Sequence, residues 1–187
     1  MSNVRRRKYM RIPFLTIVVA ASLLGCATQP APENSYSKGV AAYKVKDYAG
    51  AREHWSKASE EGYVSALDNL GYLLYYGLGG EADQAQGIQL WRRAALLGHS
   101  EAQWHLGQAF EDGEGISQDI VEAYAWYRCA VANAEQAPEG KKVEGQIAED
   151  ARKSLTALLG KLTPDQFATA ERLAKRYIED YAKSSGA

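Results

Sequence analysis

The sequence is poor in the residues that build metal sites and catalytic centres. Its 187 residues include two cysteines and three histidines. His54, His99 and His105 form no i, i+4 pair and no His-Glu-x-x-His motif, and no second cysteine completes a ligand set, which argues against zinc. The glycine-rich segments 77–80 and 113–115 are not followed by Gly-Lys-Ser or Gly-Lys-Thr, so they do not match a phosphate-binding loop. We therefore expect no metal, no cofactor and no catalytic residues, and we do not expect an enzyme.

Proline is scarce, and neither sign of charge is in large excess. The chain has five prolines, which favours helices, and a formal net charge of -1. Residues 1–25 carry five basic side chains and no acidic one, so the rest of the chain carries a net charge of -6. A mildly acidic body argues against nucleic acid as a partner.

The first 26 residues have the pattern of an export signal. A basic segment, 1–11, precedes an apolar run, 12–24, which is short for a membrane-spanning helix. The run ends in Leu-Leu-Gly before Cys26, and this resembles the lipobox of bacterial lipoproteins. The resemblance implies that residues 1–25 are a signal peptide and that Cys26 receives acyl chains such as palmitate, which anchor it to a membrane. The alternatives are a secretory signal in which Cys26 is incidental, and an uncleaved anchor.

The residues after Cys26 indicate where the anchor would lie. Ala27 stands where an aspartate often marks retention in the inner membrane, so the resemblance implies the outer membrane of a bacterial envelope, facing the periplasm. Residues 26–35 include Pro30 and Pro32 and few apolar side chains, which indicates a flexible tether.

The rest of the chain repeats itself. Shifting the sequence by 36 residues aligns small and aromatic residues at many positions. The aligned pairs are Ala66 and Ala102, Leu70 and Leu106, Gly71 and Gly107, Gly77 and Gly113, Gly79 and Gly115, Asp83 and Asp119, Trp91 and Tyr127, and Ala94 and Ala130. A further set lies 36 residues earlier: Asp47, Trp55, Ala58 and Gly62 precede Asp83, Trp91, Ala94 and Gly98. Such a period predicts one supersecondary unit used several times.

These residues resemble the Sel1-like repeat, a relative of the tetratricopeptide repeat, over residues 36–135. The resemblance implies three units, each a pair of antiparallel helices, stacked into an all-α solenoid. The first unit is shorter between Gly39 and Ala51 than its successors and resembles a plain tetratricopeptide repeat. Small residues such as Gly71 would let helices approach closely, and large ones such as Trp91 would fill the space between them. Cys129 is expected to be a buried free thiol.

Residues 141–184 are expected to close the stack as a capping hairpin of two helices. Apolar residues recur at helical spacing from Ile147 to Leu159 and from Phe167 to Tyr181. Between them, Thr163 and Gln166 have the spacing of a capping box, with Pro164 at the first helical position.

The concave face is the expected binding surface, because in this repeat family the first helix of each unit lines it. At about 100° per residue, the positions opposite the core are predicted to fall at regular intervals in each first helix. They are Asp68, Tyr72 and Tyr76 in the second unit, Trp104, Gln108 and Asp112 in the third, and Tyr36, Val40 and Lys44 in the first. Of these we select Tyr36, Asp68, Tyr72, Tyr76, Trp104 and Gln108 as candidate partner-binding residues. The alternative is that the rings pack between neighbouring repeats.

The expected function is that of a membrane-anchored envelope adaptor, which binds other envelope proteins or peptide segments on the concave face of its repeats. One alternative is that the same aromatic groove binds glycans, such as peptidoglycan. A cell-wall enzyme is a weaker alternative, because no pair of carboxylates stands out in the sequence.

Overall fold

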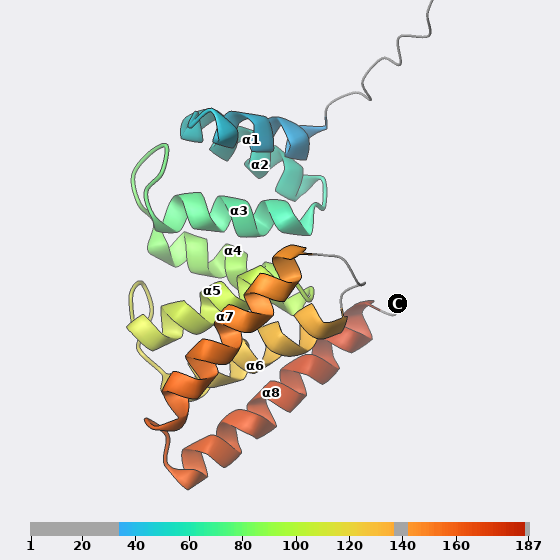
Figure 1. Ribbon diagram of the computed structural model, residues 1–187. Coiled ribbons are helices and arrows are strands. Elements are labelled where there is room, and N and C mark those ends of the chain that lie inside the picture. Colours follow the sequence, from blue (N-terminus) through green and yellow to red (C-terminus); the bar gives the residue numbers. More distant parts are fainter. Residues whose placement is uncertain (1–33, 137–141, 186–187) are drawn as a thin grey trace, which may run out of the picture. The chain divides into compact units, whose positions relative to one another are not determined.

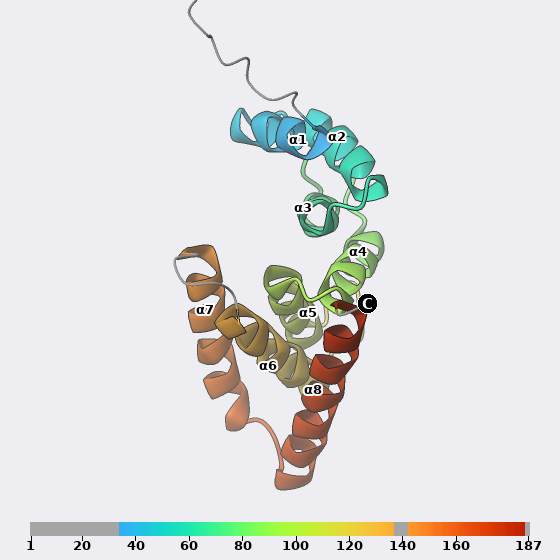
Figure 2. The ribbon, with the colours of Figure 1, turned by 90° about the vertical axis from the view of Figure 1, so that its right-hand side faces the viewer.

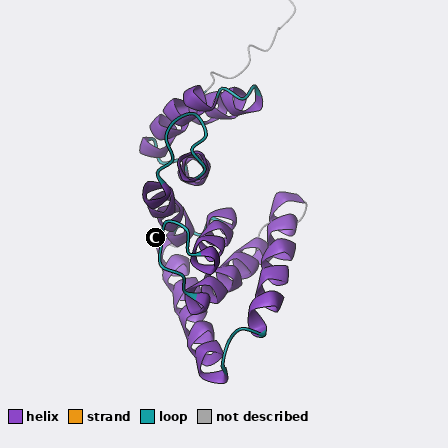
Figure 3. Ribbon diagram, turned by 90° about the vertical axis from the view of Figure 1, so that its left-hand side faces the viewer, coloured by secondary structure: helices purple, strands orange, loops and turns teal. Residues whose placement is uncertain are grey.

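The chain folds into eight helices in the part described by the computed structural model, residues 34–136 and 142–185, and no strand occurs there (Figures 1 and 3). The helices are α1 (Ser35–Lys44), α2 (Tyr48–Glu60), α3 (Val64–Tyr75), α4 (Gln84–Leu96), α5 (Ser100–Asp112), α6 (Ile120–Gln136), α7 (Lys142–Leu159) and α8 (Pro164–Ser185). The expected signal peptide, Cys26 and the tether up to residue 33 lie outside the described residues. None of the described helices is long and apolar enough to cross a membrane.

The first six helices form three pairs. Each pair packs most extensively within itself, as α1 with α2, α3 with α4 and α5 with α6, and contacts between α2 and α3 and between α4 and α5 join the pairs. Figure 2 shows α1, α3 and α5 on one side of the stack and α2 and α4 on the other. The predicted all-α solenoid of helix pairs is confirmed.

The repeated aspartates begin the second helix of each pair. The carboxylate of Asp47 accepts a hydrogen bond from the backbone N–H of Gly50 at 3.0 Å, and Asp83 does the same for Gln86 at 2.9 Å. Asp119 accepts from the N–H groups of Val121 and Glu122 at the start of α6. An N-terminal carboxylate satisfies N–H groups that have no partner inside the helix, which explains its recurrence at one period. α1 is capped in the same way by Asn34, so the helix begins at Ser35, inside the segment predicted to be tether.

The repeated glycines lie beneath large aromatic rings of the partner helix. A Cβ added at Gly107 would lie 2.5 Å from the ring of Tyr127, and one at Gly71 would lie 2.9 Å from the indole of Trp91. Both rings are almost completely buried. The predicted exchange of small against large residues therefore sets the distance between the two helices of a pair.

The loops between paired helices contact the preceding repeat. Gly79 has a φ of +82°, and a Cβ added there would clash with the backbone of Tyr48 at the start of α2. Gly115 has a φ of +73° and lies against Gln84 at the start of α4. Only glycine fits these two positions, because it has no Cβ and adopts a left-handed backbone without strain. Each loop thus helps to join one repeat to the one before it.

Helices α7 and α8 close the stack by packing on α6. The predicted capping box is confirmed: Thr163 N–H donates to Oε1 of Gln166 at 3.0 Å, and Gln166 N–H donates to Oγ1 of Thr163 at 3.3 Å. α7 also contacts α5, and α8 reaches α4. Figure 2 shows α7 and α8 on opposite sides of α6, diverging from their connecting turn. The two helices therefore enclose α6 between them.

Candidate binding groove

Two adjoining cavities lie on the side of the stack formed by α1, α3 and α5. The larger has a volume of about 590 Å³ and the smaller about 250 Å³. Asn69 of α3 and Glu101 of α5 line both cavities and so lie at the boundary between them. We call the two cavities together the groove. It spans all three repeats and includes a contribution from α7 through Ile147.

The larger cavity has aromatic walls from four helices. Tyr43 of α1, Trp55 of α2, Tyr72 of α3 and Trp104 of α5 line it, together with the aliphatic Val40. Tyr43 packs on Trp55 with ring centroids 5.5 Å apart and planes 37° apart. Burial raises the pKa of Tyr43 and of Tyr72 above the ordinary value for a phenol. Both phenols are therefore neutral near pH 7 and can donate as well as accept hydrogen bonds.

Asp68 and His105 form a buried pair at the wall of the larger cavity. Oδ1 of Asp68 lies 3.0 Å from Nδ1 of His105, and the two residues are 2 % and 6 % exposed. The imidazole also stacks on the indole of Trp91, with centroids 4.7 Å apart and planes 21° apart. An ionised carboxylate only accepts hydrogen bonds, so Nδ1 of His105 must carry a proton. In the neutral ring, Nε2 is then left as an acceptor.

This pair corrects one prediction. Asp68 was expected to point away from the core, yet its side chain is buried against His105. His105, for which the sequence analysis gave no role, links α5 to α3 and packs on Trp91 of α4. A carboxylate that faces a neighbouring helix in the next repeat gains a hydrogen-bond partner there, which lowers the cost of its burial.

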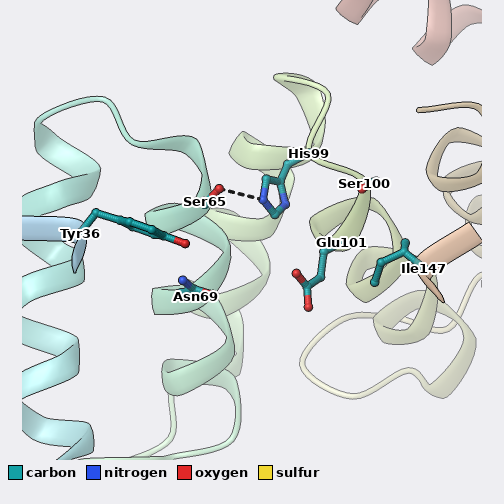
Figure 4. Close-up of a pocket in the computed structure, with 7 residues that line it drawn as sticks. All are labelled: Tyr36, Ser65, Asn69, His99, Ser100, Glu101 and Ile147. Carbon is teal, nitrogen blue, oxygen red and sulfur yellow. Dashed lines mark hydrogen bonds between the residues drawn. The ribbon is translucent and has the colours of Figure 1, made fainter. Parts of the chain in front are cut away.

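The smaller cavity is more polar. Figure 4 shows Tyr36 and Asn69 on one side and Glu101 and Ile147 on the other, with the hydrogen bond between Ser65 and His99 at one end. Its seven lining residues are Tyr36, Ser65, Asn69, His99, Ser100, Glu101 and Ile147. His99 joins two repeats, because its Nε2 lies 3.2 Å from Ser65 Oγ. Its Nδ1 accepts from the N–H of Ala102 and so caps α5.

Four of the six candidate residues line the groove, and two do not. Tyr36 lines the smaller cavity, and Asp68, Tyr72 and Trp104 line the larger one. Tyr76 is 52 % exposed and packs on Tyr72 with ring centroids 4.7 Å apart, and neither it nor Gln108 lines a cavity. Tyr36 stacks on Tyr63 and Trp104 packs on His105, so the rings combine packing with exposure to the groove. The role of all six in partner binding remains a prediction.

Several groove residues were missed by the sequence analysis. Asn69, Glu101 and His105 each lie one residue or one turn from a selected position. Tyr43 and Trp55 were assigned no role in binding, although both are aromatic and belong to the first unit. Tyr43 could have been selected, because it is an aromatic residue on the first helix of a unit, as most of the selected rings are. No period identifies Asn69, because the equivalent position in the third unit is His105.

Comparison with known proteins gives both sequence and structural relatives. The chain is 30 % identical over 121 residues to the ERAD-associated E3 ubiquitin-protein ligase component HRD3B of Arabidopsis thaliana, which covers 64 % of this chain and 20 % of that protein. The chain thus spans about a fifth of that relative's length. A protective antigen of uropathogenic Escherichia coli with an SLR fold superposes with a TM-score of 0.67 at 28 % identity, covering 80 % of this chain and 30 % of that one. A Sel1 repeat protein from Oxalobacter formigenes superposes with a TM-score of 0.51 at 28 % identity, covering 65 % and 55 %.

The profile of the Sel1 repeat matches three consecutive segments, 20–63, 64–99 and 100–134. The second and third segments coincide closely with the helix pairs α3–α4 and α5–α6. The first includes α1 and α2, although its loop is shorter than the others. Together the three segments cover more than half of the sequence, and the chain belongs to the Sel1 repeat family.

Proposed function

We propose that this protein is an adaptor that binds a partner protein in the groove between α1, α3 and α5. Sel1 repeat proteins typically mediate protein–protein interactions and are generally non-catalytic. The observation that carries the proposal is the larger cavity, which has aromatic walls and lies beside a second, polar cavity on the same side of the stack. Aromatic side chains in a cavity give a partner a large apolar contact at low entropic cost.

The relatives support an adaptor role without naming the partner. The Arabidopsis relative is, by its name, a component of a ubiquitin ligase, and it shares with this chain only the repeat region. A shared repeat module in a much longer protein supports the binding function of the module and not the activity of the whole. We accordingly place the adaptor activity of this chain in its repeats.

We further propose that the adaptor is a lipoprotein of the bacterial envelope, anchored through Cys26 at the outer membrane and facing the periplasm. The support is the sequence pattern of residues 1–26. Envelope proteins or their peptide segments would then be the partners. Mass spectrometry of the membrane fraction should detect an acylated N-terminus at Cys26. An N-terminus that begins at Met1 would contradict the anchor and would leave the groove proposal intact.

The adaptor proposal is tested by cross-linked affinity capture from intact cells. The native protein is compared with the Tyr72→Ala, Trp104→Ala double variant and with Leu159→Ala. Leu159 is a matched apolar control, because it is 50 % exposed on α7 and lines neither cavity. We expect a partner that the native protein and Leu159→Ala capture and the double variant loses. Circular dichroism should show equal helicity in all three, and capture that is equal in all three would contradict binding in the groove.

A further inference from the structure

His105 presents one ring nitrogen that the fold leaves available. Asp68 fixes the proton on Nδ1, and within residues 34–136 and 142–185 no hydrogen bond to Nε2 is formed. Because His105 lines the larger cavity, the neutral imidazole can offer an acceptor to a molecule bound there. Its orientation is fixed on one side by the carboxylate and on a ring face by Trp91. A rigid acceptor of this kind is suited to recognition.

Donors without a protein partner lie near this acceptor. Nε1 of Trp104 is buried and forms no hydrogen bond with the described residues, and the carboxamide of Asn69 likewise bonds to none of them. A buried donor without a partner is unfavourable, so a ligand that supplies an acceptor is favoured. The carboxamide offers one acceptor and two donor hydrogens. The groove therefore combines acceptors and donors, which is the complement of the N–H and C=O groups of a peptide backbone.

The arrangement of the rings favours a side chain over a sugar in the larger cavity. Planes of neighbouring rings meet at 37° for Tyr43 and Trp55, 43° for Tyr72 and His105, and 49° for Trp104 and His105. Such tilted rings form the walls of a pocket and not a flat platform on which a sugar ring could stack. A volume of about 590 Å³ accommodates one bulky apolar side chain with the backbone on either side of it.

We propose that the groove binds an extended peptide segment, with a bulky apolar side chain in the larger cavity and a backbone N–H donated to Nε2 of His105. Asp68 is the positioning residue that fixes the acceptor. The inference rests on the proposed adaptor function and specifies its ligand. His105 thereby selects segments whose backbone amide is available next to the apolar anchor, and it excludes segments in which that position is proline.

The test uses random short peptides displayed on phage and selected on the full-length protein in detergent. Selected peptides are synthesised with each backbone amide N-methylated in turn, which removes one donor at a time. We expect enrichment of one bulky apolar residue, and one amide near it whose N-methylation weakens binding about tenfold, which corresponds to 1.4 kcal/mol. That sensitivity should disappear in the Asp68→Leu, His105→Phe double variant, which removes both members of the pair and leaves no buried charge.

A second variant guards against loss of folding in the first. Asp68→Asn keeps the size of the side chain, and its amide can donate to Nδ1 and so move the imidazole proton to Nε2. In this variant, the native peptide and the peptide N-methylated at the sensitive amide should bind with equal affinity. If N-methylation costs the same in native protein and variants, the inference about His105 is overturned while peptide binding in the groove stands. If no peptide binds and cell-wall oligosaccharides do, both the inference and the adaptor function are overturned.

Discussion

The indole of Trp126 and the phenol of Tyr177 are stacked, with ring centroids 4.5 Å apart and planes 16° apart. The first belongs to α6 and is almost completely buried, and the second belongs to α8. The hydroxyl of Tyr177 also lies 3.1 Å from both carboxylate oxygens of Glu122 on α6. The terminal helix is therefore attached to the last repeat by a ring contact and a charge-assisted hydrogen bond, so it contributes to the stability of the stack.

Replacing this tyrosine should test that contribution. Tyr177→Ala removes a half-buried ring and exposes the face of Trp126, and we expect a loss of about 2 kcal/mol in the free energy of unfolding. Urea titration followed by circular dichroism measures it. Lys175→Ala on the same helix is the control, because its side chain is 79 % exposed, and it should change stability by less than about 0.5 kcal/mol. Equal effects of the two substitutions would show that the ring contact does not stabilise the fold.

A pair of glycines distinguishes close packing from helix propensity. Gly107→Ala places a methyl group 2.5 Å from the ring of Tyr127, so α5 and α6 must separate or the ring must move. We expect destabilisation of about 1–3 kcal/mol from overpacking. Gly145→Ala on α7 meets no atom within 4 Å and should stabilise the protein by about 0.5–1 kcal/mol through helix propensity. Thermal unfolding of the two variants measures the signs, and a stabilising Gly107→Ala would contradict the packing role.

The fold could be predicted because the repeat signals are local and recur. Gly107 and Tyr127 occupy the same positions as Gly71 and Trp91, and both pairs pack a ring on a glycine. The capping box at Thr163 was predictable for the same reason, because its partners are three residues apart. Short-range patterns of this kind are written in the spacing of residues and do not depend on how the repeats stack.

The site was only partly predictable, because it forms between repeats. The pair of Asp68 and His105 joins residues separated by one repeat period plus one position, so that no single-helix pattern contains it. The rule that places Asp68 opposite the core holds for an isolated helix, and in the stack His105 of α5 reaches Asp68 on that face. Tyr72 lies one turn after Asp68, and Trp104 directly precedes His105. Both rings are half-buried and line the cavity. Packing between units thus decided which outward positions remain open.

Arg52 should prove important for the junction of the first two repeats. Its Nε donates to the carbonyl of Leu78 at 2.7 Å, and its Nη2 donates to the carbonyls of Leu73 and Glu81 at 2.9 and 3.0 Å. Arg52→Ala removes these charge-assisted hydrogen bonds, two of which are partly buried, and we expect a loss of about 1–3 kcal/mol in stability. Hydrogen exchange should show faster exchange in loop 76–83 of the variant. Arg52→Lys cannot make the forked contact and should restore little.

The buried thiol of Cys129 predicts a loss of stability at alkaline pH. Burial raises its pKa from 9.0 to about 12, because the thiolate would be desolvated. A raised pKa means that the folded state binds the proton more tightly than the unfolded state. The contribution to stability is therefore complete below pH 9 and declines as the pH rises toward 12. The same sign applies to Tyr124, whose pKa burial and the carboxylate of Glu171 raise to about 12.

Cys129→Ala separates the thiol from the tyrosines. As the pH rises above 9, the variant should lose less stability than the native protein, because it has no thiol to titrate in the unfolded state. Urea titrations at several pH values measure this difference. A thiol-directed maleimide should also modify native protein far more slowly than urea-unfolded protein, since the thiol is 0 % exposed and remains protonated. Rapid labelling of the folded protein, together with parallel pH profiles of the two forms, would show that the thiol is accessible and that its burial does not control the alkaline transition.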